Sequence, residues 1–314
     1  MNPARPSPTE HAGALASGFA ALTGATFGLM VLGALVRAHG AGLSCPDWPL
    51  CFGQLVPELD LRVAFEYTHR VIAGCVSLGL AGLAFAAWRT GLIGRVRTPL
   101  GVAGVLLVVQ VVLGGLTVLL RLAPWTVTAH LLVGTSFCVS LLWASRDLFE
   151  AARERPLARP VVPAAVRGLV GAVAFLLLLQ ILLGGLVSSH AAGLGCAQFP
   201  TCDGESFAPT LEGLVGLHVL HRMNAVLLLG FGAGLAWTAR ASARVAALAW
   251  TTLRLLLFQF GVGALNVLLR LPVELTALHT ALAAALALTL SLAVREVVLA
   301  RAPRGAPAGV PEAA

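Results

Sequence analysis

Long apolar runs separated by short polar stretches dominate this chain. Runs of about 20 residues, enough to cross ~30 Å of hydrocarbon, occur at 18–38, 66–88, 99–120, 127–145, 168–188, 214–238, 247–269 and 275–294. Each run predicts one helix, because a segment inside a lipid bilayer must satisfy its own backbone hydrogen bonds. We therefore expect an all-α integral membrane protein with eight transmembrane helices.

The second half of the chain repeats the first. The segment LGALVRAH at 32–39 returns as LGGLVSSH at 183–190, and Gln110, Arg121 and His130 return as Gln259, Arg270 and His279. Each half holds four spans, so a parallel duplication of two four-helix bundles follows. We expect an N-terminal tail at 1–17, a first half at 18–145, a linker at 146–165, a second half at 166–294 and a tail at 295–314.

Composition and charge exclude a soluble domain and disfavour a nucleic-acid partner. The chain is 58% hydrophobic and 11% charged, and all 21 basic residues are arginine. The arginines gather mostly in the short connections on one side of the predicted spans, which is a topology signal and not a phosphate-binding stripe. That side should be cytoplasmic, with both termini on it, and no removable signal peptide is expected.

Four histidines recur in register at the starts of the even-numbered spans. His69 and His130 lie in the first half, and His221 and His279 lie in the second. Two imidazoles at matching depth in a four-helix bundle suit axial ligation of one heme iron. Zinc or copper is the alternative, but a closed zinc site needs further ligands, and His218 is the one extra candidate.

Charged residues accompany the first histidine of each half. Glu66 stands one helical turn before His69, and the repeat places His218 at the equivalent position of the second half. Glu66 could exchange protons at a bound heme or could simply pair with Arg70. Arg70 and Arg222 follow the two histidines directly, and each could pair a heme propionate or only reach toward the interface.

Cysteine pairs occupy the long connection of each half on the outer side. Cys45 and Cys51 recur as Cys196 and Cys202. Because these connections should face an oxidising compartment, we expect one disulfide in each. The first disulfide could be a structural staple or a redox-active pair.

These motifs together resemble heme A synthases of the bacterial type with cysteine pairs in the outer loops. The resemblance rests on GLSCPDWPLC at 42–51, the Glu66-x-x-His69-Arg70 motif and the duplicated histidines. It implies an oxidoreductase of the cell membrane that oxidises the C8 methyl of heme O to a formyl group, giving heme A for terminal oxidases. It further implies that His69 and His130 hold the substrate heme O beside a catalytic Glu66, and that His221 and His279 hold a heme b cofactor.

The resemblance also implies partners and leaves rivals open. An electron donor, not identified by the sequence, is required, and a complex with heme O synthase would deliver the substrate. A non-enzymatic di-heme cytochrome b is the main alternative, and a thiol-oxidising membrane protein that uses the loop cysteines is another. A thiol-oxidising function would leave the four histidines that recur in both halves unexplained.

Overall fold

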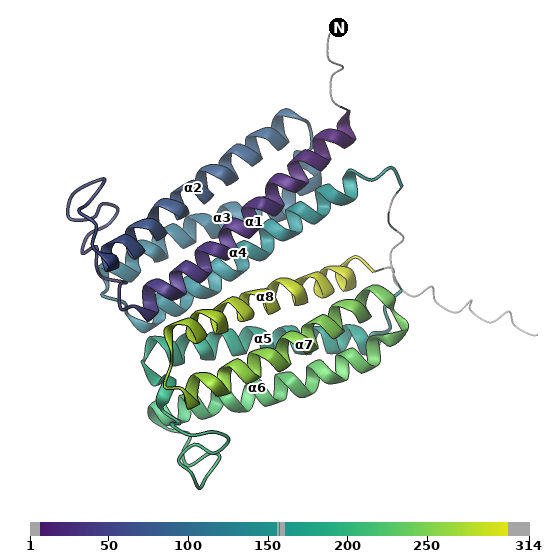
Figure 1. Ribbon diagram of the computed structural model, residues 1–314. Helices are drawn as coiled ribbons and strands as arrows, with labels where there is room; N and C mark the ends of the chain where they lie inside the picture. Colours follow the sequence, from purple (N-terminus) through teal and green to yellow (C-terminus); the bar gives the residue numbers. More distant parts are fainter. Residues whose placement is uncertain (1–6, 156, 158–160, 301–314) are drawn as a thin grey trace, which may run out of the picture.

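Eight long α-helices make up most of the computed structural model, which describes residues 7–155, 157 and 161–300 (Figure 1). They are α1 (Pro8–Ala38), α2 (Leu61–Arg89), α3 (Ile93–Leu119), α4 (Pro124–Ala151), α5 (Ala164–Ser189), α6 (Gly213–Thr238), α7 (Ala243–Leu268) and α8 (Val273–Val298). Each is long and apolar enough to cross a membrane. The prediction of an eight-span helical membrane protein is confirmed.

Several helices continue beyond the predicted spans. Helix α1 begins at Pro8 because Ser7 and Glu10 form a capping box, in which each side chain accepts the backbone N–H of the other residue. Helices α4 and α8 run to Ala151 and Val298, so the linker and the C-terminal tail are shorter than 146–165 and 295–314. An apolar run gives only the part of a helix that lies in the hydrocarbon of the membrane. The helix itself continues into polar turns at its ends. Residues 1–6, 156, 158–160 and 301–314 of the expected tails and linker lie outside the described residues.

The helices form two four-helix bundles that lie side by side (Figure 1). Helices α1–α4 pack around a cluster of buried apolar residues that includes Phe19 and Leu141, and α5–α8 pack around one that includes Val173 and Leu235. Loop 1 (residues 39–60) and loop 2 (residues 190–212) leave the bundles at the same end, opposite the connection between α4 and α5. We call these the loop end and the linker end.

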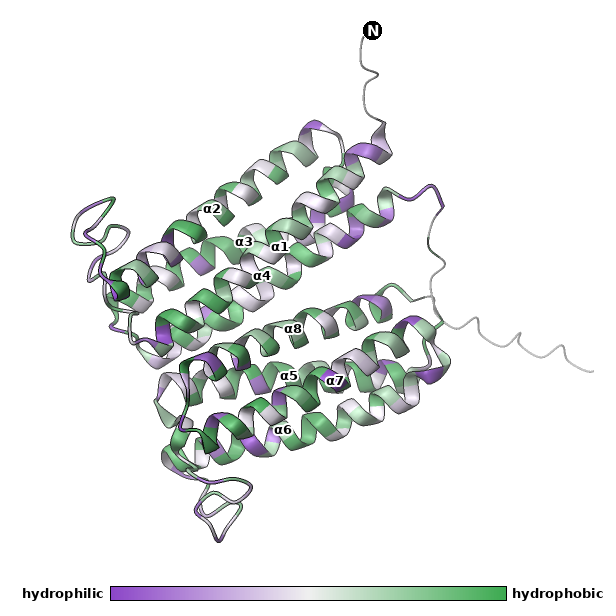
Figure 2. Cartoon of the chain, in the orientation of Figure 1, coloured by the Kyte–Doolittle hydropathy of each residue, from purple (hydrophilic) through white to green (hydrophobic). Residues whose placement is uncertain are grey.

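Hydrophobic residues predominate along the helices of both bundles (Figure 2), and many of them are exposed. Phe85 and Trp88 on α2 and Phe175 and Leu178 on α5 are 55–65% exposed. Exposed apolar surface of this extent would aggregate in water but is stable against lipid tails. The surface therefore agrees with burial in a bilayer.

Polar contacts join the two bundles where α1 and α4 meet α5 and α8. At the linker end, Arg295 of α8 donates to Asp147 at 2.5 Å and to Glu150 at 2.6 Å, both on α4. At the loop end, Thr128 of α4 and Ser189 of α5 lie 3.2 Å apart. Arg295 is therefore not part of a tail, as the sequence suggested, but a buried link between the halves.

Candidate heme and loop-anchor site

The four histidines lie at the loop end of the bundles, beyond the apolar clusters. His69 and His130 lie in the first three turns of α2 and α4, whereas the residues of these helices that join the large apolar cluster begin at Val76 and Phe137. In each half one imidazole comes from the second helix and one from the fourth, and both lie near the start of their helix. The structure thus places two of the predicted histidines at the loop end of each bundle.

The chemistry of these pairs fits heme better than a bare metal ion. The Nδ1 atoms of His69, His130 and His279 are buried without a hydrogen-bond partner, which is costly unless the ring serves another purpose. Among the described residues, no group of three or more His, Cys, Asp or Glu side chains could hold a metal ion. Two imidazoles suffice when a porphyrin supplies the remaining four ligands, so the residues present fit a heme in each half.

A glycine of the preceding helix faces each of the four imidazoles. A Cβ atom added at Gly33, Gly114, Gly184 or Gly263 would lie 3.1–3.3 Å from Cε1 of His69, His130, His221 or His279, respectively. Sequence reasoning did not connect these glycines to the histidines. The signal available was the recurrence of a glycine before each histidine in both halves, 16 residues before His130 and His279 and 36 or 37 residues before His69 and His221.

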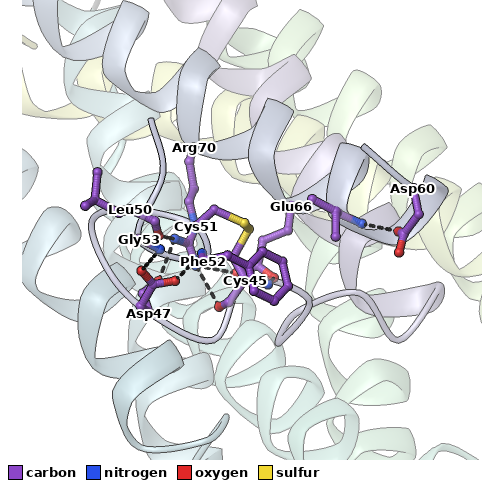
Figure 3. Close-up of a disulfide and its surroundings, with 10 residues drawn as sticks. Cys45, Asp47, Leu50, Cys51, Phe52, Gly53, Asp60, Glu66 and Arg70 are labelled. Carbon is purple, nitrogen blue, oxygen red and sulfur yellow. Dashed lines mark hydrogen bonds and ion pairs between the residues drawn. A yellow bond between two sulfur atoms is a disulfide. The ribbon is translucent and has the colours of Figure 1, made fainter. Parts of the chain in front are cut away.

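Loop 1 is anchored to α2 by Glu66 and Arg70 (Figure 3). Glu66 accepts the backbone N–H of Cys45 at 2.9 Å through Oε2 and pairs with Arg70 at 2.6 Å through Oε1. Arg70 also donates to the carbonyl oxygens of Cys45, Asp47 and Leu50 at 2.6–3.2 Å. The carboxylate and the guanidinium together hold the backbone of loop 1 on both sides of the first disulfide.

Loop 2 is anchored to α6 in the same way, with His218 in the place of Glu66. His218 Nδ1 faces the backbone N–H of Cys196 at 3.1 Å, and its Nε2 faces Nε of Arg222 at 3.2 Å. Arg222 donates to the carbonyls of Cys196, Gln198 and Thr201. A neutral imidazole has one nitrogen that can accept, so it satisfies one of these two donors. A carboxylate satisfies both, which makes the first anchor the stronger one.

The two predicted disulfides are present. Cys45 is bonded to Cys51 and Cys196 to Cys202, and all four cysteines are at most 3% exposed. Both arginines donate terminal N–H groups to loop carbonyls and so anchor the loops. Pairing with a heme propionate stays a prediction, and the ion pair between Arg70 and Glu66 that the sequence left open is formed.

A second carboxylate, Asp47, organises the tip of loop 1 (Figure 3). Its two oxygens accept the backbone N–H groups of Gly53 at 2.8 Å and Phe52 at 2.7 Å. The hydrogen bond from Gly53, helped by the one from Phe52 and by the charge of Arg70, holds the pKa of Asp47 below its usual range. The ionised form is the one that fits the folded loop.

This pKa shift predicts an acid-sensitive loop tip. Because the folded pKa is lower than the unfolded value of about 4, Asp47 stabilises the loop above that value and loses its contribution as the pH falls through the folded pKa. Reduction of the first disulfide by a small phosphine should therefore accelerate in acid. Asp47→Asn should react faster at pH 7 and show a smaller acid dependence. Equal pH profiles for the two proteins would contradict this role.

Comparisons with known proteins agree with this arrangement. Residues 19–64 and 60–291 match the family COX15-CtaA, described as a cytochrome oxidase assembly protein. A heme A synthase of Shewanella oneidensis is 30% identical over 294 residues, covering 80% of this chain and 87% of its own. A heme A synthase of Alkalihalophilus pseudofirmus is 31% identical over 230 residues, covering 71% and 76%.

A relative with a different name matches a shorter segment. A protoheme IX farnesyltransferase of Halobacterium salinarum is 39% identical over 119 residues, which cover 38% of this chain and 27% of its own. The family match, by contrast, extends through both bundles, both loops and all four histidines. The chain therefore belongs to the COX15-CtaA family of cytochrome oxidase assembly proteins.

Proposed function

We propose that this protein is a heme A synthase, an oxidoreductase that converts the C8 methyl group of heme O to a formyl group through hydroxylated intermediates. The relatives that share both halves of the chain carry this name. The observation that carries the proposal is the pairing of half-buried imidazoles in two equivalent bundles, of which only the first has a carboxylate, Glu66, one turn from a histidine. Two similar sites, one with Glu66 and one with His218 at the same position, are suited to one substrate heme and one permanently bound heme.

In this proposal His69 and His130 bind the substrate heme O, and His221 and His279 bind heme b. Heme b supplies electron transfer when bound. Glu66, held in place by Cys45 and Arg70, would stabilise positive charge that develops at the reacting methyl carbon. The first disulfide acts as a structural part of the anchor, because Cys45 contacts Glu66 directly through its backbone.

The proposal includes a location and partners. The distribution of arginine supports a cell-membrane protein with both termini in the cytoplasm, and an electron-transfer partner outside the chain completes the reaction. The segment shared with a protein named protoheme IX farnesyltransferase supports heme O as the substrate and a complex with the enzyme that makes it. Direct transfer within such a complex would keep an apolar heme away from water.

Glu66→Ala tests the proposed chemistry. We expect cells that express the wild-type protein with a source of heme O to accumulate heme A, and cells with the variant to accumulate heme O or its hydroxylated form, because the charge at the reacting carbon is lost. Mass analysis of extracted hemes measures all three. Undiminished heme A in the variant would refute the role of Glu66. If only heme b were found in the wild type, a di-heme cytochrome b would be the better description.

A further inference from the structure

A glutamine precedes the histidine-facing glycine by one helical turn on three helices but not on the fourth. These pairs are Gln110 and Gly114 on α3, Gln180 and Gly184 on α5, and Gln259 and Gly263 on α7. On α1 the corresponding residue before Gly33 is Leu29. Residues four apart lie on the same helix face, so each glutamine faces the same histidine as its glycine. His69 is thus the one histidine of the four without an amide opposite it.

The three glutamines contact their histidines. Nε2 of Gln110 lies 3.2 Å from Nε2 of His130, and Nε2 of Gln180 lies 3.2 and 3.3 Å from the two ring nitrogens of His221. Nε2 of Gln259 donates to the backbone carbonyl of His279 at 3.0 Å. An amide inside a membrane helix is costly, so its recurrence opposite three histidines needs a reason beyond packing.

The pair around His221 is the most firmly held. Asn224, which is 5% exposed, donates to Oε1 of Gln180 at 2.7 Å and to the backbone carbonyl of Leu176 at 3.0 Å. In the first half the repeat places Ile72 at the position of Asn224 and Leu29 at that of Gln180. These contacts fix Gln180 with its N–H groups toward the ring of His221, whereas both equivalent positions of the first half hold aliphatic residues.

The remaining glutamines carry unused polar atoms that match those of their histidines. Oε1 of Gln110 and of Gln259 is buried without a partner, and so is Nδ1 of His130 and of His279. An imidazole that binds iron through one nitrogen nearly always donates its other N–H to a nearby oxygen. Each of these pairs holds the acceptor and the donor that such a bond requires.

We infer that Gln110 and Gln259 position the imidazoles of His130 and His279 by accepting their free N–H groups, that Gln180, fixed by Asn224, holds the ring of His221 by contact, and that Leu29 makes His69 the exchangeable ligand of the protein. The inference rests on the proposed function and deepens it, since a substrate heme must leave after each reaction and a resident heme must stay. Partners beyond the direct ligands change metal affinity by about 10–100-fold. The side chain at position 29 or 180 would then set how long each half retains its heme.

Reciprocal substitutions in the full-length protein test this inference. Gln180→Leu is placed in a His69→Ala background, which isolates the second site, and Leu29→Gln in a His221→Ala background, which isolates the first. Heme release is followed by its transfer to excess apomyoglobin. We expect Gln180→Leu to release heme about 10-fold faster or more and to lower the fraction of six-coordinate, low-spin heme. Leu29→Gln should slow release by a similar factor.

The control is Leu178→Gln, which adds an amide to the exposed face of the same helix α5 and should leave heme release unchanged. Slower heme release from Leu29→Gln cannot result from a folding defect, which would speed release. If heme release is unchanged in Leu29→Gln, or in Gln180→Leu when its parent protein binds heme, the inference is wrong but the proposed function stands. A His69→Ala parent that binds no heme in its second half would overturn the proposed function and the inference with it.

Discussion

Arg70→Met is expected to destabilise loop 1 and its contact with α2 by about 3–5 kcal/mol, the usual effect of leaving a buried charge without its partner. The Glu66 side chain is 6% exposed and keeps only the N–H of Cys45 when the guanidinium is removed. The carbonyls of Cys45, Asp47 and Leu50 lose their donor at the same time. Cleavage of loop 1 by a protease in detergent micelles, together with the free energy of unfolding, measures the effect.

Arg222, the equivalent of Arg70 in the second half, provides the control. Arg222→Met removes the same kind of loop contacts, but the residue it leaves behind, His218, can be neutral. The expected cost is therefore only about 1–3 kcal/mol for lost hydrogen bonds. Adding Glu66→Gln to Arg70→Met removes the stranded charge and should recover part of the lost stability. Equal costs for the two arginine variants would show that the ion pair with Glu66 is not what anchors loop 1.

Arg295→Met is expected to weaken the association of the two bundles by about 3 kcal/mol, at the low end of the range for buried pairs. The Arg295 side chain is 4% exposed, while Asp147 on the facing helix is 29% exposed and partly compensated by solvent. The substitution removes the cation that Asp147 and Glu150 of α4 share. Denaturant titration of the full-length protein should show the loss.

A looser pair near the same end of α8 is the matched control. Arg244 lies 3.7 Å from Glu296, and the two side chains are 39% and 11% exposed. Because the contact is long and the guanidinium is exposed, its expected contribution is only about 1 kcal/mol, so Arg244→Met should cost much less than Arg295→Met. A loss for Arg244→Met as large as that for Arg295→Met would mean that burial of Arg295 is not the cause.

The sequence was sufficient for the number of helices, their division into halves and the two disulfides. Each of these depends on patterns that repeat along the chain: the length of apolar runs, the internal duplication and the spacing of Cys45 and Cys51. The linker boundaries were less accurate, because Asp147 and Arg295 look like residues of polar connections until α4 and α8 are seen to bring them together.

The anchors of the loops were not predictable from the same patterns. Arg70 and Arg222 were visible as positive charges beside histidines, but the carbonyl groups that they bind come from backbone positions 20 to 26 residues away, and nothing in the side-chain sequence marks them. The glycine and glutamine contacts of the histidines were present in the repeat. They required the helix neighbours, such as α1 beside α2 and α5 beside α6, to be known before they could be recognised.

Because the duplication is parallel, both disulfide-bearing loops emerge from the same end of the molecule. In a sealed vesicle, a membrane-impermeant thiol reagent or reductant can therefore reach both loops or neither. A single labelling experiment on oriented vesicles would report the sidedness of the whole protein. Any enzyme that forms or breaks these bonds in the cell must act on both halves from one compartment.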